Sequence, residues 1–136
     1  MANPLRIATV VVAVLSAGAC AETPLGPLAA GQWGGEHIGM VVTSSGASVE
    51  YDCAHGTIGV PIEIQDGGRF HATGTHTFEH GGPVREDEPP DNHPAEYRGR
   101  VSGGTMNLTV TLTDTTLTIG KFTLVRGGSP IVFKCL

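Results

Sequence analysis

The stretch TMNLTVTLT, residues 105–113, alternates polar and apolar side chains without a break. Successive side chains of a β-strand point to opposite faces, so this pattern predicts a strand with one apolar side. The Thr and Val content also favours a strand over a helix. A strand with one apolar and one polar face is typical of an antiparallel sheet that covers a core.

The same alternation recurs along the chain and predicts eight strands, most of them joined by short turns that carry Gly or Asp. The predicted strands are Gly31–Thr43, Ser48–Cys53, Thr57–Gln65, Arg69–Glu79, Ala95–Val101, Thr105–Thr113, Thr116–Arg126 and Pro130–Leu136. Within the seventh strand the apolar parity changes between Ile119 and Phe122. This change predicts a β-bulge near Gly120.

Eight strands joined by short hairpins can close into a barrel that leaves no exposed edge. The predicted fold class is therefore all-β, an eight-stranded antiparallel up-and-down barrel, with a flattened β-sandwich as the alternative. A barrel of this size is either filled by its own side chains or holds one small ligand. If it is hollow, we expect Val60, Ile62, Met106 and Leu108 to line the lumen.

The N-terminus predicts export. Residues 7–19 are apolar or small, a run shorter than the roughly 20 residues that span a bilayer, which indicates a signal peptide over 1–19. The small residues before Cys20 fit ordinary signal cleavage, and they also resemble the lipobox that precedes a lipidated cysteine. Residues 20–30 contain two prolines and suit a tether to a barrel domain at 31–136.

Three cysteines, Cys20, Cys53 and Cys135, give an odd count, which needs an explanation in an exported protein. If Cys20 carries lipid, Cys53 and Cys135 remain to form a disulfide in an oxidising compartment. Two separate buried thiols are the alternative. The spacing contains no C-x-x-C and so indicates no zinc motif.

The formal net charge is −5 and the sequence has no basic patch, which excludes nucleic acid as an expected partner. The expected location is the cell envelope, with the protein attached to a membrane through the lipid anchor. The expected partners there are a small apolar ligand or another envelope protein.

The opening of the first predicted strand, Gly31-Gln32-Trp33, resembles the G-x-W motif of lipocalins and their calycin relatives. The resemblance implies that Trp33 closes one end of the barrel beneath Arg126 or Lys134, through a cation–π contact. The stretches WGGEHIGM (33–40), DCAHGTI (52–58) and KCL (134–136) are also similar to small barrels among bacterial secreted proteins and lipoproteins. That likeness implies no activity.

Residues 76–80, HTFEH, fit the H-x-x-E-H pattern of one class of zinc proteases. In those enzymes the motif lies on a helix, where residues four apart share a face. Here it ends a predicted strand, which would hold His76 and His80 about 13 Å apart and turn Glu79 to the other side. Zinc ligands must converge to about 2 Å from the metal. We therefore predict no metal site here, and no cofactor.

Four other polar residues, Glu36, His37, Asp52 and His55, could meet where the strands that carry them end. Carboxylate–imidazole pairs can transfer protons or bind a metal, so an envelope enzyme that uses these four residues is one hypothesis. The simpler interpretation is that Asp52 and His55 satisfy the backbone of a turn at Ala54-His55-Gly56. The main hypothesis is a binding module without catalytic residues.

Overall fold

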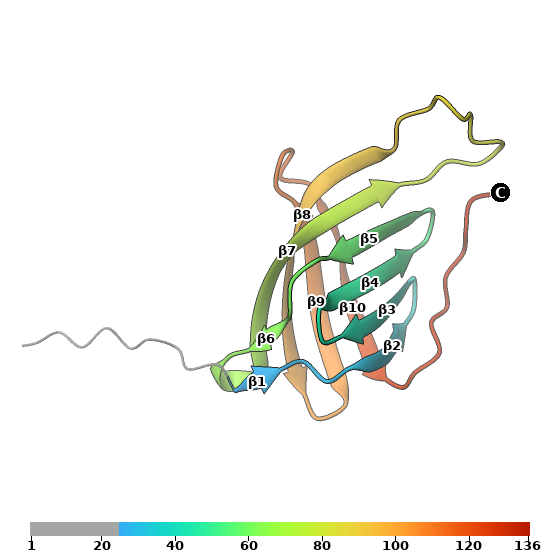
Figure 1. Ribbon diagram of the computed structural model, residues 1–136. Helices are drawn as coiled ribbons and strands as arrows, with labels where there is room; N and C mark the ends of the chain where they lie inside the picture. The colour runs from blue at the N-terminus through green and yellow to red at the C-terminus, as the bar shows by residue number, and fades with distance from the viewer. Residues whose placement is uncertain (1–24) are drawn as a thin grey trace, which may run out of the picture.

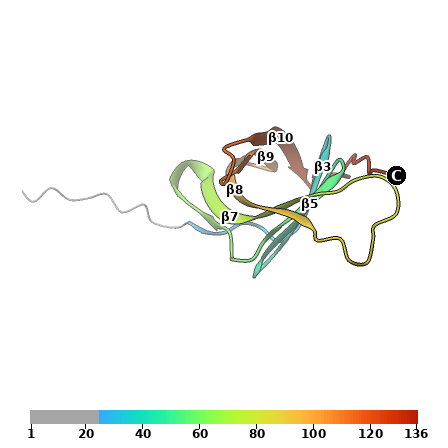
Figure 2. The same ribbon diagram turned by 90° about the horizontal axis from the view of Figure 1, so that it is seen from above.

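A computed structural model describes residues 25–136 of the chain. The predicted signal peptide, the lipidation candidate Cys20 and the start of the tether lie outside the described residues. The described part is a closed barrel of eight antiparallel strands in the order β10-β2-β3-β4-β5-β7-β8-β9 (Figure 1; Figure 2). Apart from the pair that closes the barrel, each strand pairs with its neighbours along the chain, so the up-and-down barrel predicted from the sequence is confirmed.

The barrel strands are β2 (Gly31–Gly35), β3 (Ile38–Thr43), β4 (Gly46–Tyr51), β5 (Ala54–Ile58), β7 (Arg69–Phe78), β8 (Asp91–Ser102), β9 (Thr105–Leu112) and β10 (Thr118–Arg126). A single 3-10 turn, η1 (Asp66–Gly68), precedes β7. The register of β9 and β10 shifts between Thr118 and Gly120, which confirms the predicted bulge.

The division into strands differs from the prediction at both ends of the barrel sequence. The predicted strand Gly31–Thr43 is two strands, β2 and β3, because the chain reverses at Glu36 and His37. The predicted strand Pro130–Leu136 is not in the barrel. It belongs to an irregular tail, residues 127–136, with one bridge from Ile131 to Glu36. The strand count stays at eight because one strand is gained and one is lost.

The alternating strand directions give the barrel two ends. We call the end with the turns at 36–37 and 52–53, the loop 79–90 and the turn 113–117 the mouth. The other end, the base, carries the turns at 44–45 and 103–104 (Figure 1).

The base is covered by a small two-stranded sheet in which β1 (Gly26–Pro27) pairs with β6 (Glu63–Ile64). Leu28 donates its backbone N–H to the carbonyl of Ile62 at 2.8 Å, and both side chains are buried. Residues 25–30, the described part of the predicted tether, therefore pack on the barrel.

The interior between base and mouth is packed with side chains that alternate along the strands. Its largest fully buried members are Trp33, Ile38, Met40, Val49, His76, Tyr97, Met106, Leu108, Val110, Leu112 and Leu124. Ile62, Met106 and Leu108, which were expected to line a lumen, belong to this packed cluster. Val60 is 49% exposed, so its assignment to the lumen was wrong: the chain leaves β5 after Ile58 and the alternation stops there.

The barrel closes at the pairing of β2 with β10, which consists of three residue pairs from Leu124–Gly35 to Arg126–Trp33. The tail lies against this seam. A Cβ on Gly34 would approach the carbonyl oxygen of Gly128 to 2.3 Å, and one on Gly39 would lie 2.7 Å from Cβ of Pro130. Glycine is required at both positions because the tail passes so close, with its backbone against Gly34 and the Pro130 ring against Gly39.

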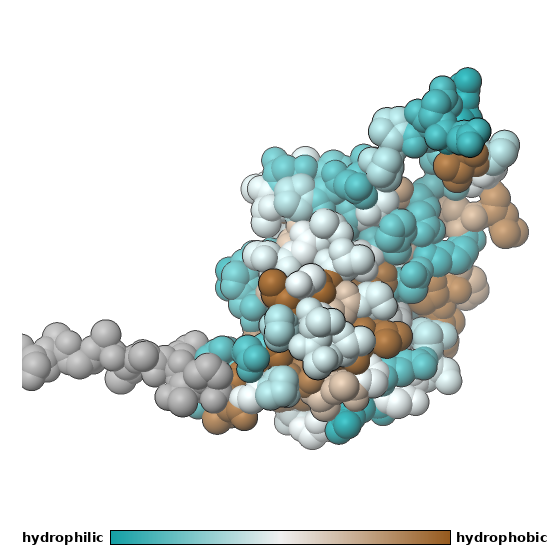
Figure 3. Space-filling model, viewed as in Figure 1, coloured by the Kyte–Doolittle hydropathy of each residue, from teal (hydrophilic) through white to brown (hydrophobic). Residues whose placement is uncertain are grey.

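The tail continues past the seam to the mouth, where Cys135 forms a disulfide with Cys53. This bond confirms the predicted cysteine pair. Ile131, Phe133 and Leu136 remain exposed on the tail, and Figure 3 shows hydrophobic residues in brown near the C-terminus. Among the described residues, no helix is long and apolar enough to cross a membrane.

Candidate functional site

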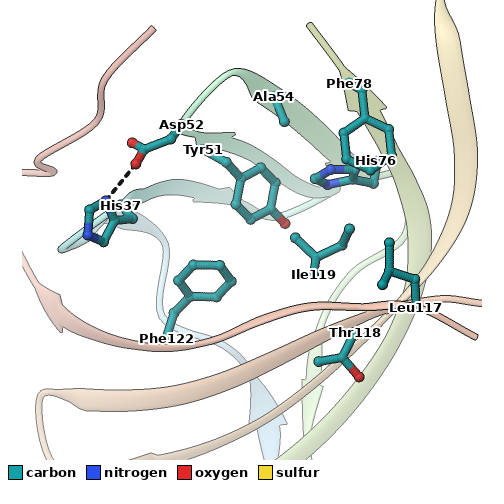
Figure 4. Close-up of a pocket in the computed structure, with 10 residues that line it drawn as sticks. All are labelled: His37, Tyr51, Asp52, Ala54, His76, Phe78, Leu117, Thr118, Ile119 and Phe122. Carbon is teal, nitrogen blue, oxygen red and sulfur yellow. Dashed lines mark hydrogen bonds and ion pairs between the residues drawn. The ribbon is translucent and has the colours of Figure 1, made fainter.

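A pocket of about 380 Å³ opens at the mouth of the barrel (Figure 4). Small-molecule sites typically have volumes of about 300–1,000 Å³, so the pocket can hold a small organic molecule. Its lining residues come from three turns of the mouth and from the strands β4, β5, β7 and β10. They are His37, Tyr51, Asp52, Ala54, His76, Phe78, Leu117, Thr118, Ile119 and Phe122.

Aromatic and aliphatic side chains form most of the pocket wall. Tyr51 ends β4 and points inward in step with Val49, and its ring centroid lies 5.7 Å from that of Phe122. The bulge at Gly120 shifts the parity of β10, so that Ile119 and Phe122 both reach the mouth half-buried. The parity change in the sequence, which predicted the bulge, therefore also indicates that Ile119 and Phe122 lie on the same pocket wall.

Two polar side chains at this site have no hydrogen-bond partner among the described residues. They are His76, whose two ring nitrogens are both unpaired, and Tyr51, whose hydroxyl has no partner in good hydrogen-bond geometry and lies beside the hydroxyl of Tyr97. His76 is 1% exposed and Tyr51 is 3% exposed, so water does not replace the missing partners at the surface. Buried polar groups are nearly always hydrogen-bonded, because burial without a partner is unfavourable. Sequence reasoning considered His76 only as a zinc ligand and did not single out Tyr51.

Both groups are uncharged at neutral pH. Burial lowers the pKa of His76, and the charges of His93 and His55 lower it further, so the imidazole stays neutral. Burial, together with the adjacent Tyr97, raises the pKa of Tyr51. The floor of the pocket therefore offers hydrogen-bond donors and acceptors without a formal charge.

The four residues of the predicted polar site separate into two groups. His37 and Asp52 meet, with 2.6 Å between Nδ1 and Oδ2, and a carboxylate oxygen of Glu36 lies 3.7 Å from Nε2 of His37. His55 instead contacts Glu79, with 2.7 Å between Nδ1 and Oε1. The expectation that all four residues form one site is wrong, because His55 lies on β5 and pairs with the end of β7.

Asp52 binds the backbone of the C-terminal tail. Its Oδ1 accepts a hydrogen bond from the backbone N–H of Phe133 at 2.8 Å. This bond, followed by the contact with His37, lowers the pKa of Asp52 despite some opposing desolvation. The tail also binds two of the non-glycine turn residues with left-handed backbone, His37 (φ 66°) and Cys53 (φ 49°), whose backbone N–H groups donate to the carbonyls of Ile131 and Phe133. These contacts support a structural role for the turns.

Lys134 also holds the tail to the mouth. Its ammonium contacts the carboxylates of Glu50 and Glu79 and donates to the carbonyl of Ala54 at 3.0 Å. Trp33 lies toward the base, opposite Arg126 in the β2–β10 ladder. The expected contact between Lys134 and Trp33 is therefore wrong.

The burial of Trp33 agrees with its expected role in closing the barrel. The residue is 1% exposed, and its indole N–H donates to the carbonyl of Ala29 at 3.3 Å. Stacking of Arg126 on the indole stays a prediction.

The H-x-x-E-H residues lie as strand geometry requires. His76 points into the barrel, Glu79 contacts His55 and Lys134, and His80 contacts Glu88, with 2.7 Å between Nε2 and Oε1. Within residues 25–136, no group of three or more His, Cys, Asp or Glu side chains is arranged to hold a metal ion.

The fold and the pocket define a small closed antiparallel β-barrel with an aromatic-lined mouth. Comparison with known proteins adds nothing to this class: no family model matches the chain, and neither a curated protein nor a solved structure matches it.

Proposed function

We propose that this protein is an exported, lipid-anchored binding module of the cell envelope, lipocalin-like in holding a small apolar ligand at the mouth of its barrel. The observation that carries the proposal is the mouth pocket, whose wall is largely aromatic and aliphatic. Apolar walls with a few polar groups are characteristic of small-molecule sites.

The Cys53–Cys135 disulfide supports the location, because disulfides persist in oxidising compartments outside the cytosol. The proposed anchor rests on the residues before Cys20 and on the cysteine count. With Cys53 and Cys135 paired, Cys20 is the only cysteine left for lipid.

The alternative, an envelope enzyme using Glu36, His37, Asp52 and His55, has less support. His55 lies in a different pair from His37 and Asp52, and Asp52 already accepts a backbone hydrogen bond from the tail. A general base must reach the proton of a bound substrate. The arrangement of these residues accounts for how the tail is held, and it does not require a substrate.

Binding of the uncharged dye N-phenyl-1-naphthylamine tests the proposal, because the fluorescence of this dye rises in apolar surroundings. We expect saturable binding to the wild-type protein and at least a tenfold loss of affinity in Ile119→Trp, where the larger ring fills the mouth. The matched control is Ile131→Trp, at an exposed tail position outside the pocket wall. Equal binding by both variants, or no binding to the wild type, would contradict the proposal.

A further inference from the structure

The unpaired polar groups of the mouth lie next to each other. The ring centroids of Tyr51 and His76 are 4.9 Å apart, and both residues line the pocket. Figure 4 shows the hydroxyl of Tyr51 pointing toward Ile119, in the middle of the ring of lining residues. Tyr97, the other buried tyrosine, differs because its hydroxyl donates a hydrogen bond to the carbonyl of Thr75 at 2.6 Å.

A ligand can reach His76 through side chains that are already partly in solvent. The ring of His76 lies between Tyr51 and Phe78, with centroids 4.7 Å apart on the Phe78 side. Phe78 is 37% exposed and Leu117, across the opening, is 53% exposed. A ligand that displaces these two side chains toward solvent would reach the imidazole.

The charges at the mouth favour an uncharged ligand. No Lys or Arg is present among the ten lining residues, and Lys134 beside Ala54 is already paired with two carboxylates, so a bound anion would have no free cation to pair with. Asp52 stands at the rim, and the chain carries a net charge of −5, which also opposes an anion. A cation would lie close to the imidazole, whose burial already disfavours positive charge.

We infer that the ligand of the mouth pocket is an uncharged molecule with an apolar, ring-sized body and one hydroxyl or carbonyl group, to which His76 and Tyr51 form hydrogen bonds. The inference rests on the proposed function of the pocket as a binding site. A neutral imidazole has one donor and one acceptor, and a phenol hydroxyl can act as either. A hydroxyl on the ligand can therefore partner both groups, whose burial is otherwise uncompensated.

Three probes with the same ring system separate the contributions of the ring, of a hydroxyl and of a negative charge to binding. They are naphthalene, 2-naphthol and 2-naphthoate, and their affinities are measured by calorimetry at pH 7. We expect 2-naphthol to bind about tenfold more tightly than naphthalene, since one hydrogen bond to a previously unpaired buried group contributes about that factor. The carboxylate of 2-naphthoate should bind more weakly than 2-naphthol, because no cation compensates its desolvation.

Two variants assign the preference to the residues. In Tyr51→Phe, which removes one oxygen, and in His76→Phe, the advantage of 2-naphthol over naphthalene should fall by threefold or more. The control Thr57→Val removes an exposed hydroxyl that is bonded to Thr75 outside the pocket wall, and it should keep the preference. The ring nitrogens of His76 should also shift in 15N NMR on addition of 2-naphthol and not of naphthalene.

The outcomes distinguish the two proposals. Equal affinity for naphthalene and 2-naphthol would overturn the inference about the ligand and leave the apolar pocket standing. A preference that survives in both variants would also overturn it. If neither compound binds, the inference and the proposed function both fail. Tyr51→Phe keeps the test decisive if His76→Phe does not fold.

Discussion

The rings of Tyr51 and His76 lie 4.9 Å apart at the mouth of the barrel, and neither has a hydrogen-bond partner for its polar atoms among the described residues. This pair distinguishes the mouth from the rest of the interior, where Tyr97 and Trp33 both bond to backbone carbonyls. The pair is also where the stability and pH behaviour of the barrel can be tested without knowing the ligand.

Acidification should destabilise the protein through His76. Its folded-state pKa lies below the ordinary value of 6.5, so below pH 6.5 the unfolded chain binds a proton that the folded protein does not. The stabilising contribution of the neutral His76 to the free energy of unfolding is therefore fully present above pH 6.5, and it is lost as the pH falls toward the folded-state pKa. Between pH 7.5 and 5.5, the unfolding free energy of the wild type should fall relative to that of His76→Phe.

Urea titrations at several pH values measure this difference. His80 and His93, whose pKa values are raised by hydrogen bonds to Gly81 and Glu88 and to Asp114 respectively, contribute with the opposite sign. The contribution of His80 is the same in both proteins and cancels in the comparison, whereas His93 is paired with His76 across β7 and β8, so the midpoint of His93 must be followed by NMR in both proteins. Parallel stability curves, or an NMR titration midpoint for His76 above 6.5, would show that the imidazole is not buried and neutral.

Removal of the two tyrosine hydroxyls should have opposite effects on stability. Tyr51→Phe replaces an unpaired buried hydroxyl with hydrogen, so the unfolding free energy should stay unchanged or rise. Tyr97→Phe loses the bond to the Thr75 carbonyl and should be less stable by about 1 kcal/mol. Chemical denaturation of the two variants under the same conditions provides the comparison. A larger loss in Tyr51→Phe would indicate a partner for that hydroxyl.

Loss of the Cys53–Cys135 disulfide should lower the free energy of unfolding by up to about 4–5 kcal/mol in the chain-entropy model, since the bond joins residues 82 positions apart. The double variant Cys53→Ala/Cys135→Ala avoids leaving a reactive thiol. Mass mapping of the exported wild type without reductant should find the two cysteines linked. Free thiols at both positions would contradict the pairing.

Truncation of Trp33 to Ala should cost about 3–5 kcal/mol, as for other large buried aromatic residues. Because Trp33 is the single tryptophan, its fluorescence reports directly on this position. We expect blue-shifted emission that iodide quenches poorly. A red-shifted emission with free quenching would place the indole in solvent and remove the basis of the resemblance to lipocalins.

The lipid anchor makes a separate prediction about the N-terminus. The mature wild-type chain should begin at Cys20 and carry the mass of a lipid, and it should partition with membranes. Cys20→Ser should move the protein to the soluble fraction and leave the barrel folded. An unmodified mature chain that starts at another residue would show that the signal is cleaved in the ordinary way.

The strands were predictable wherever one strand carried one uninterrupted alternation, as in β9, where Met106, Leu108 and Val110 all point inward. The reversal at His37 was missed although the apolar parity changes between Trp33 and Ile38, because that change alone does not distinguish a turn from a bulge. The contacts that hold the turn, such as the bond from the His37 N–H to the Ile131 carbonyl, come from the distant tail.

The same limit applies to the candidate site. The meeting of His37 and Asp52 was foreseen, since both lie at strand ends that short turns bring together. The contacts of Glu79 with His55 and Lys134 depend on which strand follows β5 in the barrel and on the path of the tail. The pocket itself depends on Leu117, in the turn 113–117, and on Phe78, at the end of β7. These two residues belong to elements that are not neighbours in the barrel, and no sequence motif links them.

The short seam between β2 and β10 has a consequence for the order of folding. Its partners, such as Trp33 and Arg126, are far apart in the chain, while the long β7–β8 ladder of ten residue pairs is a single hairpin. Local pairs form early and distant pairs late, because closing a long loop costs entropy before any contact forms. Until β10 docks, the edges of β2 and β9 stay unpaired and can recruit strands from other molecules. The interval between formation of the hairpins and docking of β10 is thus when this chain is most prone to aggregate.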